Sequence, residues 1–335
     1  MTELGPLLAA DNILDLAWSP DGALLAITPS TGETLIVDEG GRIHERRPEH
    51  LLGNGRPAWF QGQLVTCGFD GKVRFSLSRE VTPGRGLIDR VRTSPDGKLL
   101  AAGQGKDLHV FDKSLRPGSP LPPMPSTVMD FVWNPANSSE LAIVGAGGAR
   151  MWRLGGGEPY ARFDWGGASL GVDWSSCGRW LVTADQTPSV HIYDFSRDYP
   201  LHIQGYETKV LAMDFSADGK KLATGGGPVV TIWPCVGESG PEGVTPIQLD
   251  GHDSDVIAAA FSPVTDQLAT GDETGALLIF TFEAKQVRRK RVRRSAGVVA
   301  LAWHPSKPLL AVGHSDGAVA ILTLEASTCT PAETR

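Results

Sequence analysis

Residues 17–38 read AWSPDGALLAITPSTGETLIVD, and a similar stretch returns near the other end of the chain as AWHPSKPLLAVGHSDGAVAIL at 302–322. Each copy holds an aromatic residue, a small polar turn, a Leu-Ala run, a Gly-containing turn and an alternating apolar run. Short runs with a period of two between turn residues predict β-strands. One such unit cannot bury both of its faces, so neighbouring units must stack on it.

Six further copies fall into phase with these two, at 58–77, 92–112, 132–152, 173–194, 214–233 and 260–280. We call the residue at the aromatic position the anchor. The anchors are Trp18, Trp59, Thr93, Trp133, Trp174, Phe215, Phe261 and Trp303. The steps between them are 41, 34, 40, 41, 41, 46 and 42 residues. A period near 40–45 with four strand-like runs per unit predicts a β-propeller.

The units resemble those of the WD-repeat family. Ser19-Pro20-Asp21-Gly22 matches the family's first turn, Gly251-His252 its Gly-His dipeptide, and Tyr193-Asp194 stands where Trp-Asp usually stands. The resemblance implies an all-β propeller with four antiparallel strands per blade. Eight copies predict eight blades. Seven remains the alternative, because the step of 34 into Thr93 is short and that repeat lacks an anchor aromatic.

The ends of the chain predict how the ring closes. The last repeat has no good fourth strand, so Leu7 and Leu8 are expected to supply the outer strand of the last blade. The chain is then one propeller domain over 1–335. In it, 1–12 close the ring and 325–335 form a C-terminal tail.

The family's hydrogen-bond network is incomplete in this sequence. It requires His before the first strand, Ser or Thr in the second, Asp in the following turn and Trp in the third. The seventh repeat has His252 and Thr270, but Thr274 is aligned with the Asp position and Phe280 with the Trp position. We therefore expect hydrophobic packing, rather than this network, to hold the blades.

Composition indicates an ordinary globular chain. Hydrophobic residues make up 41%, charged residues 21%, and the net charge of −7 argues against nucleic-acid binding over the whole surface. The four cysteines are far apart in the sequence and predict free thiols in a reducing compartment. No window is apolar enough for a membrane span. We expect a cytoplasmic protein that is a monomer on its own.

No catalytic motif is found, and Gly225-Gly226-Gly227-Pro228 is interpreted as a turn rather than a phosphate loop. His109 and His191 are interpreted as structural, because they lie on non-adjacent blades and metal ligands must converge. No metal, cofactor or catalytic residue is predicted. The expected function is a non-enzymatic scaffold for a protein partner. The alternative is a propeller enzyme of metal-dependent hydrolase or lactonase type.

The run at 285–294 contains seven basic residues in ten. It is predicted to form the outer strand of the seventh blade, anchored by Val287 and Val292. One interpretation is a charged edge that prevents aggregation. The other is a docking stripe for an acidic protein, a nucleic-acid backbone or an anionic lipid surface. The basic residues are Lys285, Arg288, Arg289, Lys290, Arg291, Arg293 and Arg294.

The residues three before each anchor are expected to line the central channel. The first four are charged and the last four are small. The charged ones could pair between neighbouring blades as Asp15 with Arg56 and Arg90 with Asp130, or form a polar pocket for a small ion or ligand.

The resemblance further implies that partners dock on the face formed by the loops before the first strand and after the second strand of each blade. Exposed aromatic residues there are candidate hot spots; ordinary loop packing is the alternative. The corresponding residues are Phe69, Gln104, Lys106, Trp165, Gln186, Tyr206, Glu273 and His314.

Overall fold

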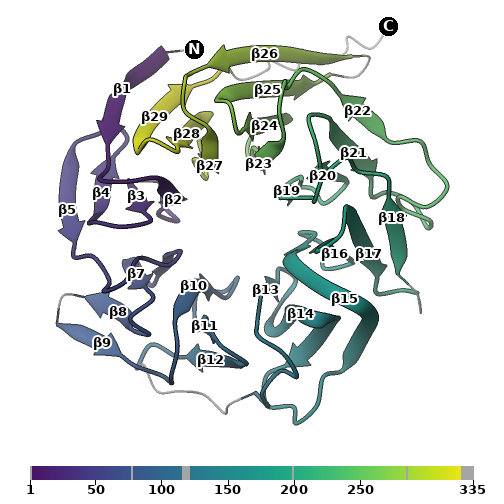
Figure 1. Ribbon diagram of the computed structural model, residues 1–335, viewed down its shortest axis with the longest axis horizontal. Helices are drawn as coiled ribbons and strands as arrows, with labels where there is room; N and C mark the ends of the chain where they lie inside the picture. The colour runs from purple at the N-terminus through teal and green to yellow at the C-terminus, as the bar shows by residue number, and fades with distance from the viewer. Residues whose placement is uncertain (1, 77, 115–120, 198–199, 284–285, 326–335) are drawn as a thin grey trace, which may run out of the picture.

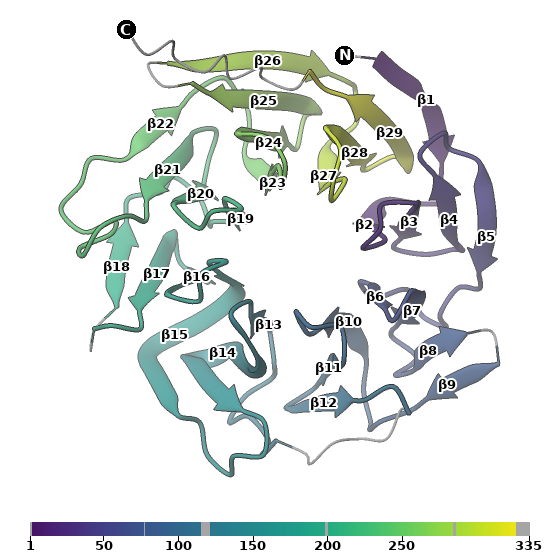
Figure 2. The ribbon, with the colours of Figure 1, turned by 180° about the vertical axis from the view of Figure 1, so that it is seen from behind.

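The chain forms a ring of antiparallel β-sheets around a central axis (Figures 1 and 2). The structure is a computed structural model and describes residues 2–76, 78–114, 121–197, 200–283 and 286–325. Strands account for all the regular elements in these residues, and no helix occurs among them. The all-β propeller predicted from the repeat is therefore present.

The strands are arranged in shells from the axis outward (Figure 1). The innermost are β2 (Ile13–Trp18), β6 (Ala58–Phe60), β10 (Ile88–Thr93), β13 (Asp130–Asn134), β19 (Ala212–Phe215), β23 (Val256–Phe261) and β27 (Val298–Trp303). The second shell is β3 (Leu24–Pro29), β7 (Gln63–Cys67), β11 (Leu100–Gln104), β16 (Trp180–Asp185), β20 (Lys221–Gly225), β24 (Gln267–Asp272) and β28 (Leu309–His314).

The third shell is β4 (Thr34–Asp38), β8 (Val73–Ser76), β12 (Asp107–Phe111), β17 (Ser189–Asp194), β21 (Val230–Pro234), β25 (Ala276–Phe282) and β29 (Ala318–Thr323). The outermost strands are β1 (Thr2–Leu8), β5 (Ile43–Arg47), β9 (Arg79–Val81), β18 (Leu201–Gln204), β22 (Ile247–Leu249) and β26 (Val287–Arg293). Two long strands, β14 (Asn137–Arg153) and β15 (Ala161–Trp174), extend across more than one of these positions.

The described strands form seven hydrogen-bonded sheets, not the eight separate ones predicted. Five sheets have four strands, and the sheet of β10, β11 and β12 has three among the described residues. The remaining sheet has six strands and holds the fourth and fifth repeats. The cause is β15, which pairs with β14 through Ala161–Ala168 and then, without a break, with β16 through Ser169–Trp174.

Five of the eight anchor residues join neighbouring sheets through side-chain hydrogen bonds. The indole Nε1 of Trp59 donates to the carbonyl oxygen of Ala17 at 2.9 Å, and Trp18, Trp133 and Trp303 donate to the preceding repeat in the same way. Thr93, which lacks an aromatic ring, keeps the contact by donating from Oγ1 to the carbonyl oxygen of Trp59 at 2.7 Å. The short repeat is therefore structurally in phase with its neighbours.

The Ser-Pro-Asp-Gly stretch closes the turn between the first and second strands. The hydroxyl of Ser19 donates to Asp21 at 2.6 Å, and the backbone N–H of Leu24 donates back to Ser19 Oγ at 3.0 Å. Gly22 has a φ of 76°, a left-handed conformation that favours glycine. The same bonds recur at Ser94 and Ser216, so the turn motif has one structure in three repeats.

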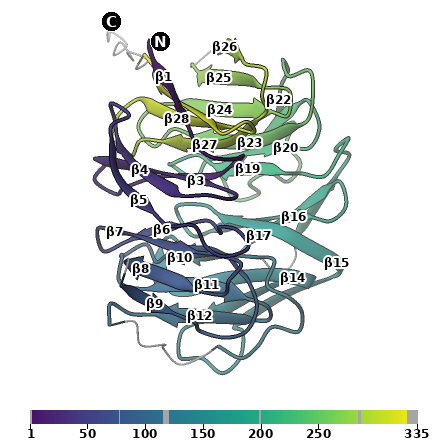
Figure 3. The same ribbon diagram turned by 60° about the vertical axis from the view of Figure 1, so that its left-hand side comes forward.

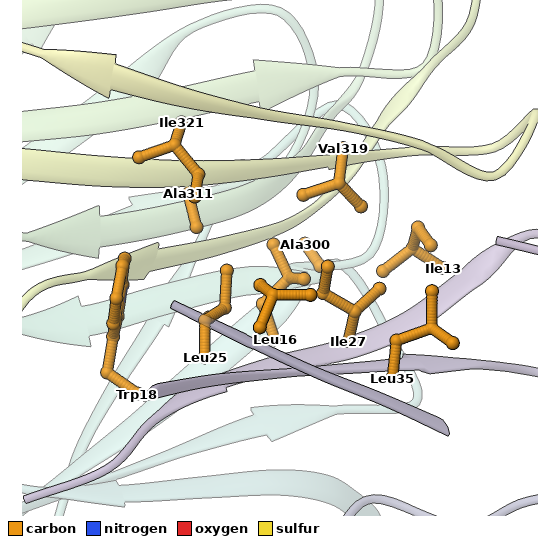
Figure 4. Packing of buried hydrophobic residues seen from close by; sticks show 11 residues of the cluster. Ile13, Leu16, Trp18, Leu25, Ile27, Leu35, Ala300, Ala311, Val319 and Ile321 are labelled. Atoms are coloured by element: carbon orange, nitrogen blue, oxygen red, sulfur yellow. The ribbon is translucent and has the colours of Figure 1, made fainter. Parts of the chain in front are cut away.

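The first and last strands of the chain lie side by side. β1 pairs antiparallel with β29, with Thr2 opposite Thr323 and Leu8 opposite Ala318. The two strands lie beside each other in Figure 1, and Figure 3 shows β1 near the yellow strands of the last repeat. The sheet of β2–β5 also packs on the sheet of β27–β29 through a buried apolar cluster. Ile13, Leu25 and Ile27 meet Ala311, Val319 and Ile321 there (Figure 4). Leu7 packs on the edge of this cluster, whereas Leu8 is 73% exposed.

The hydrogen-bond network is more complete than the sequence suggests. In the seventh repeat the carboxylate that binds His252 belongs to Asp272, the last residue of β24, and Thr274 instead donates its own backbone N–H to Asp272. In the second repeat His50 contacts Asp70 at 2.9 Å and Thr66 at 3.0 Å. The expectation that packing alone holds the blades is therefore wrong for these two repeats.

Candidate binding surfaces

The repeat topology places two sets of loops on one face of the ring. Because each sheet is antiparallel and each repeat has the same strand order, segments that enter innermost strands lie beside turns that follow second-shell strands. We call this the loop face. Of the eight residues predicted here, four are exposed: Phe69, Lys106, Gln186 and Glu273. They come from different turns around the ring and do not form one cluster.

The other four predicted residues are occupied within the protein. Gln104 is 2% exposed and donates from Nε2 to the carbonyl oxygen of Gly86 at 2.6 Å. His314 is 3% exposed, with Nδ1 3.0 Å from the carbonyl oxygen of Ala296. These two side chains cannot contact a partner in this conformation, because loop folding has buried them.

Trp165 and Tyr206 are half-buried. The hydroxyl of Tyr206 bonds Thr224 at 2.8 Å and accepts a hydrogen bond from Trp233 at 3.1 Å. It thus replaces the histidine of the network in the sixth repeat. The indole of Trp165 donates to Ser169 at 3.2 Å. Both aromatic rings are held by internal contacts.

The predicted residue Phe69 belongs to a group of exposed apolar side chains on the loop face, whose other three members were not predicted. We call it the loop-face patch: Leu51 (71% exposed), Leu52 (77%), Phe69 (41%) and Leu87 (51%). Backbone hydrogen bonds join the segments that carry these side chains. Phe69 N–H donates to Gly53 at 2.9 Å, and Ile88 N–H donates to Gly68 at 3.0 Å. The Leu51-Leu52 pair before a Gly-Asn-Gly turn is the sequence signal that could have revealed it.

The loop that carries the patch is held firmly in place. The His50 imidazole is buried between Asp70 and Thr66, and Asp70 also accepts the Leu51 N–H at 3.3 Å. Asn54 accepts the His50 N–H at 3.1 Å. Leu52 itself has a φ of 71°, which is rare for a side chain without a local hydrogen-bonding group. The patch is therefore preorganised rather than a loose loop tip.

The basic run forms an edge strand as predicted, within the described part of 285–294. β26 pairs with β25 on the outside of its sheet, from Val287 opposite Phe282 to Arg293 opposite Ala276 (Figure 1). Val287 packs on the apolar cluster toward β19–β22, and Val292 packs on the cluster toward β27–β29. Lys285 lies outside the described residues.

Many charges of this strand are paired internally. Arg291 and Arg293 both contact the carboxylate of Asp253, the latter at 3.2 Å. Arg289 donates to the carbonyl oxygen of Asp250 at 2.5 Å. On the other face Arg288 pairs with Glu283 at 2.9 Å, while Lys290 is exposed and Arg294 half-buried. The alternation of strand residues explains this division into two faces.

The channel contains a cavity of about 540 Å³ lined by all four predicted charged residues. Arg90 donates to Asp130 at 2.5 Å, and Arg92 also contacts Asp130 at 3.2 Å. Asp15 and Arg56, both described, form no ion pair. The backbone N–H of Arg56 donates to the backbone carbonyl oxygen of Asp89, in the next repeat, at 2.6 Å.

Two further carboxylates, which were not predicted from the sequence, line the cavity. Asp173 and Asp214 stand one residue before their anchors, which is the same side of the strand as three residues before. Each accepts a backbone N–H from the next repeat, of Phe215 at 3.3 Å and of Phe261 at 2.6 Å. Burial raises the pKa of Asp214, and the neighbouring Asp173 raises it further.

One group among the described residues could hold a metal ion. Asp185, His191 and His202 offer ligand atoms that all lie within 4.8 Å of one another. This group was not predicted from the sequence, because the pairing of His202 with His191 on the adjacent strand is a cross-strand contact that residue spacing does not report.

Comparisons with known proteins give matches to repeat families. The family described as "WD domain, G-beta repeat" matches residues 198–233, and "Anaphase-promoting complex subunit 4 WD40 domain" matches residues 259–332. The crystal structure of the computationally designed Ika8 protein is similar, with a TM-score of 0.81, 17% identity, and coverage of 96% of this chain and 99% of that one. This likeness concerns the fold alone.

Several plant proteins are similar in sequence to this chain. "Cell division cycle 20.6, cofactor of APC complex" of Arabidopsis thaliana is 26% identical over 68% of this chain and 58% of its own length. "Protein FIZZY-RELATED 3" of Arabidopsis thaliana and "B-type cell cycle switch protein ccs52B" of Medicago truncatula are each 24% identical over 68% of this chain, and over 50% and 49% of their own lengths. The chain thus spans about half the length of these relatives. The repeats, the ring and these matches make the chain similar to WD-repeat β-propeller proteins.

No helix long and apolar enough to cross a membrane is found in the described part of the chain.

Proposed function

We propose that this chain is a non-enzymatic interaction scaffold that binds a protein partner through the loop-face patch. Four large apolar side chains stand exposed on three segments that backbone hydrogen bonds join, and buried hydrogen bonds hold the segment that carries Leu51 and Leu52. Exposed apolar groups on a rigid surface are typical of interaction sites. The relatives named as cofactors of the APC complex support a role as an adaptor within a larger protein assembly.

Leu52 is the observation that carries this proposal. A leucine with a φ of 71° is strained, at a cost of about 1–3 kcal/mol for such conformations. Its side chain is 77% exposed, so it gains little from burial in the isolated chain. Asparagine or glycine would suit this backbone better. A partner that buries the side chain would explain why leucine occupies the position.

The test separates stability from binding. In Leu52→Asn combined with Phe69→Ser, we expect the melting temperature to stay the same or rise, because backbone strain is relieved. We expect quantitative affinity capture with mass spectrometry to show loss of partners. Val264→Ser is the matched control, since Val264 is 43% exposed and lies in a turn on the opposite face. Equal capture by wild type, control and double variant would contradict the proposal.

For the basic strand we propose the edge-protecting role. Its position outside β25 and its pairing with Asp253, Glu283 and the Asp250 carbonyl support this, because much of its charge is used within the chain. Replacing Arg288, Arg289, Arg291 and Arg293 with Ser is expected to cause self-association in light scattering. Selective loss of an acidic protein, nucleic-acid or anionic-vesicle ligand, with no self-association, would instead indicate a docking stripe.

We also propose that the six-stranded sheet is two blades that share β15, so that the chain is one closed eight-bladed domain with β1 as the closing strand. Met151 of β14 packs in one apolar cluster with Leu181 and Tyr193, which requires the two halves of that sheet to face each other. Eightfold class averages along the ring axis in electron microscopy would support this count, and sevenfold averages would refute it.

We place the protein in the cytoplasm, as a monomer when isolated. The free thiols of Cys67, Cys177 and Cys235 support a reducing compartment. Light scattering of the isolated chain and localisation of a tagged copy test these two expectations.

A further inference from the structure

Two histidines stand directly opposite each other on adjacent strands. His191 of β17 pairs with His202 of β18 in the antiparallel register, and their rings are nearly parallel, at 5°, with centroids 4.2 Å apart. An imidazole binds a transition-metal ion through the lone pair of one ring nitrogen, and here two imidazoles stand face to face.

A buried carboxylate completes the group. Asp185 is 0% exposed and accepts hydrogen bonds from the hydroxyls of Ser169 at 3.2 Å, Thr183 at 3.3 Å and Ser189 at 3.0 Å. Within the described residues its ion-pair partner is His191, whose Nδ1 lies 2.8 Å away. A divalent cation would compensate the negative charge of this buried carboxylate more fully than these hydrogen bonds do.

We propose that Asp185, His191 and His202 form a binding site for Zn²⁺ or a similar divalent transition-metal ion, with water as the fourth ligand. Two imidazole nitrogens and one carboxylate oxygen are an established donor set for such ions. The ligand atoms lie within 4.8 Å of one another, and the exposed ring of His202 can move to close the remaining distance. The bound ion would replace the hydrogen bond between His191 Nδ1 and Asp185.

The surroundings suit this role. The ring of Trp165 lies 5.1 Å from that of His191 and 6.5 Å from that of His202, and its Nε1 donates to the same Ser169 that bonds Asp185. Such outer contacts orient metal ligands and limit access of water. Because the ligands come from β16, β17 and β18 and the outer contacts from β15, a bound ion would link four neighbouring strands.

The experiment uses the full chain, with any affinity tag removed and after treatment with a chelator. All proteins carry Cys177→Ser, because this exposed thiol could bind zinc by itself. Calorimetric titration with ZnCl₂ is expected to give one ion per chain, and His202→Gln is expected to weaken binding about 10- to 100-fold or more. His44→Gln is the matched control, since His44 is an exposed histidine bonded to Asp38 at 2.9 Å without a second histidine.

Two further readouts distinguish this site from unspecific binding. Zn²⁺ should raise the melting temperature of the parent and of His44→Gln but not of His202→Gln, and its affinity should fall from pH 7.5 to pH 6 as protons compete. Co²⁺ should give the visible absorption of a tetrahedral site only where His202 is present. Absence of 1:1 binding by the parent, or unchanged affinity in His202→Gln, would overturn the proposal.

Discussion

The Nδ1 atom of His252 lies 2.9 Å from a carboxylate oxygen of Asp272, and neither side chain has any exposed surface. The other ring nitrogen lies 2.7 Å from the hydroxyl of Thr270. This pair ties the segment before β23 to the end of β24. It therefore fixes a loop-face segment to the sheet beneath it, as the pair of His50 and Asp70 does in the second repeat.

Removing the imidazole should destabilise the protein. His252→Ala leaves the buried carboxylate of Asp272 without this hydrogen bond, and loss of a hydrogen bond to a charged group costs about 1.5–3 kcal/mol. Urea unfolding followed by tryptophan fluorescence measures the change. His44→Ala on the surface is the control and should shift the free energy of unfolding by less than about 0.5 kcal/mol. Similar values for the two variants would show that the network contributes little.

Acid should weaken the fold at mild pH. Burial lowers the pKa of both His50 and His252 below the ordinary value of 6.5. The unfolded chain then binds more protons than the native chain, so stability present above about pH 6.5 is lost as the pH falls toward the native pKa. Melting temperatures between pH 8 and pH 5.5 should decrease, with a shallower decrease in His50→Asn. A flat profile in the wild type would contradict this assignment.

The ion pair in the channel should matter more than one on the surface. Asp130 is 5% exposed and accepts hydrogen bonds from Arg90 and from the N–H of Val172 in the next repeat. Asp130→Asn leaves the largely buried Arg90 guanidinium without this carboxylate, so the free energy of unfolding should fall by about 2–4 kcal/mol. Asp253→Asn is the control, because Asp253 lies exposed in the segment before β23 and pairs with Arg291 and Arg293 of β26, so its replacement should cost less than about 1 kcal/mol.

Asp214, another carboxylate of the channel, should make stability depend on pH in the opposite direction. Because burial and Asp173 raise the pKa of Asp214, the native state favours its protonated form. The stability that protonated Asp214 contributes to the native state is present at acidic pH and is lost as the pH rises through the raised pKa. Asp214→Asn keeps an oxygen that can accept the Phe261 N–H, and it should raise the melting temperature at pH 8 but not at pH 5. A lower melting temperature at both pH values would refute this explanation.

Closure of the ring by β1 predicts a strong effect of a short deletion. Removing residues 2–8 exposes the outer edge of β29 and the apolar side of Val319 and Ile321. We expect the melting temperature to fall by several degrees and the chain to self-associate through the new edge. Leu8→Ser is the control, because Leu8 is 73% exposed and its replacement leaves the backbone pairing intact. Equal melting curves for the deletion and the wild type would exclude a closing role.

Much of the architecture follows from the sequence alone. Alternation within each repeat predicted short β-strands separated by turns, and the repeat phase placed β26 on the outside of its sheet. These features depend on local patterns, because side-chain period and turn chemistry are properties of a few adjacent residues. The same locality explains why the Ser-Pro-Asp-Gly turns and the anchor positions were predictable.

Other features depended on the tertiary structure. Whether β15 ends one sheet and begins another is decided by pairing with strands on both sides, which repeat spacing does not report. Three more features arise only when segments from different strands pack together. Gln104 and His314 become buried, and Asp272 rather than Thr274 bonds His252. His191 also comes to lie opposite His202. The repeat period determined the ring, but exposure and partnership of single side chains are set by cross-strand and inter-sheet contacts that no local pattern encodes.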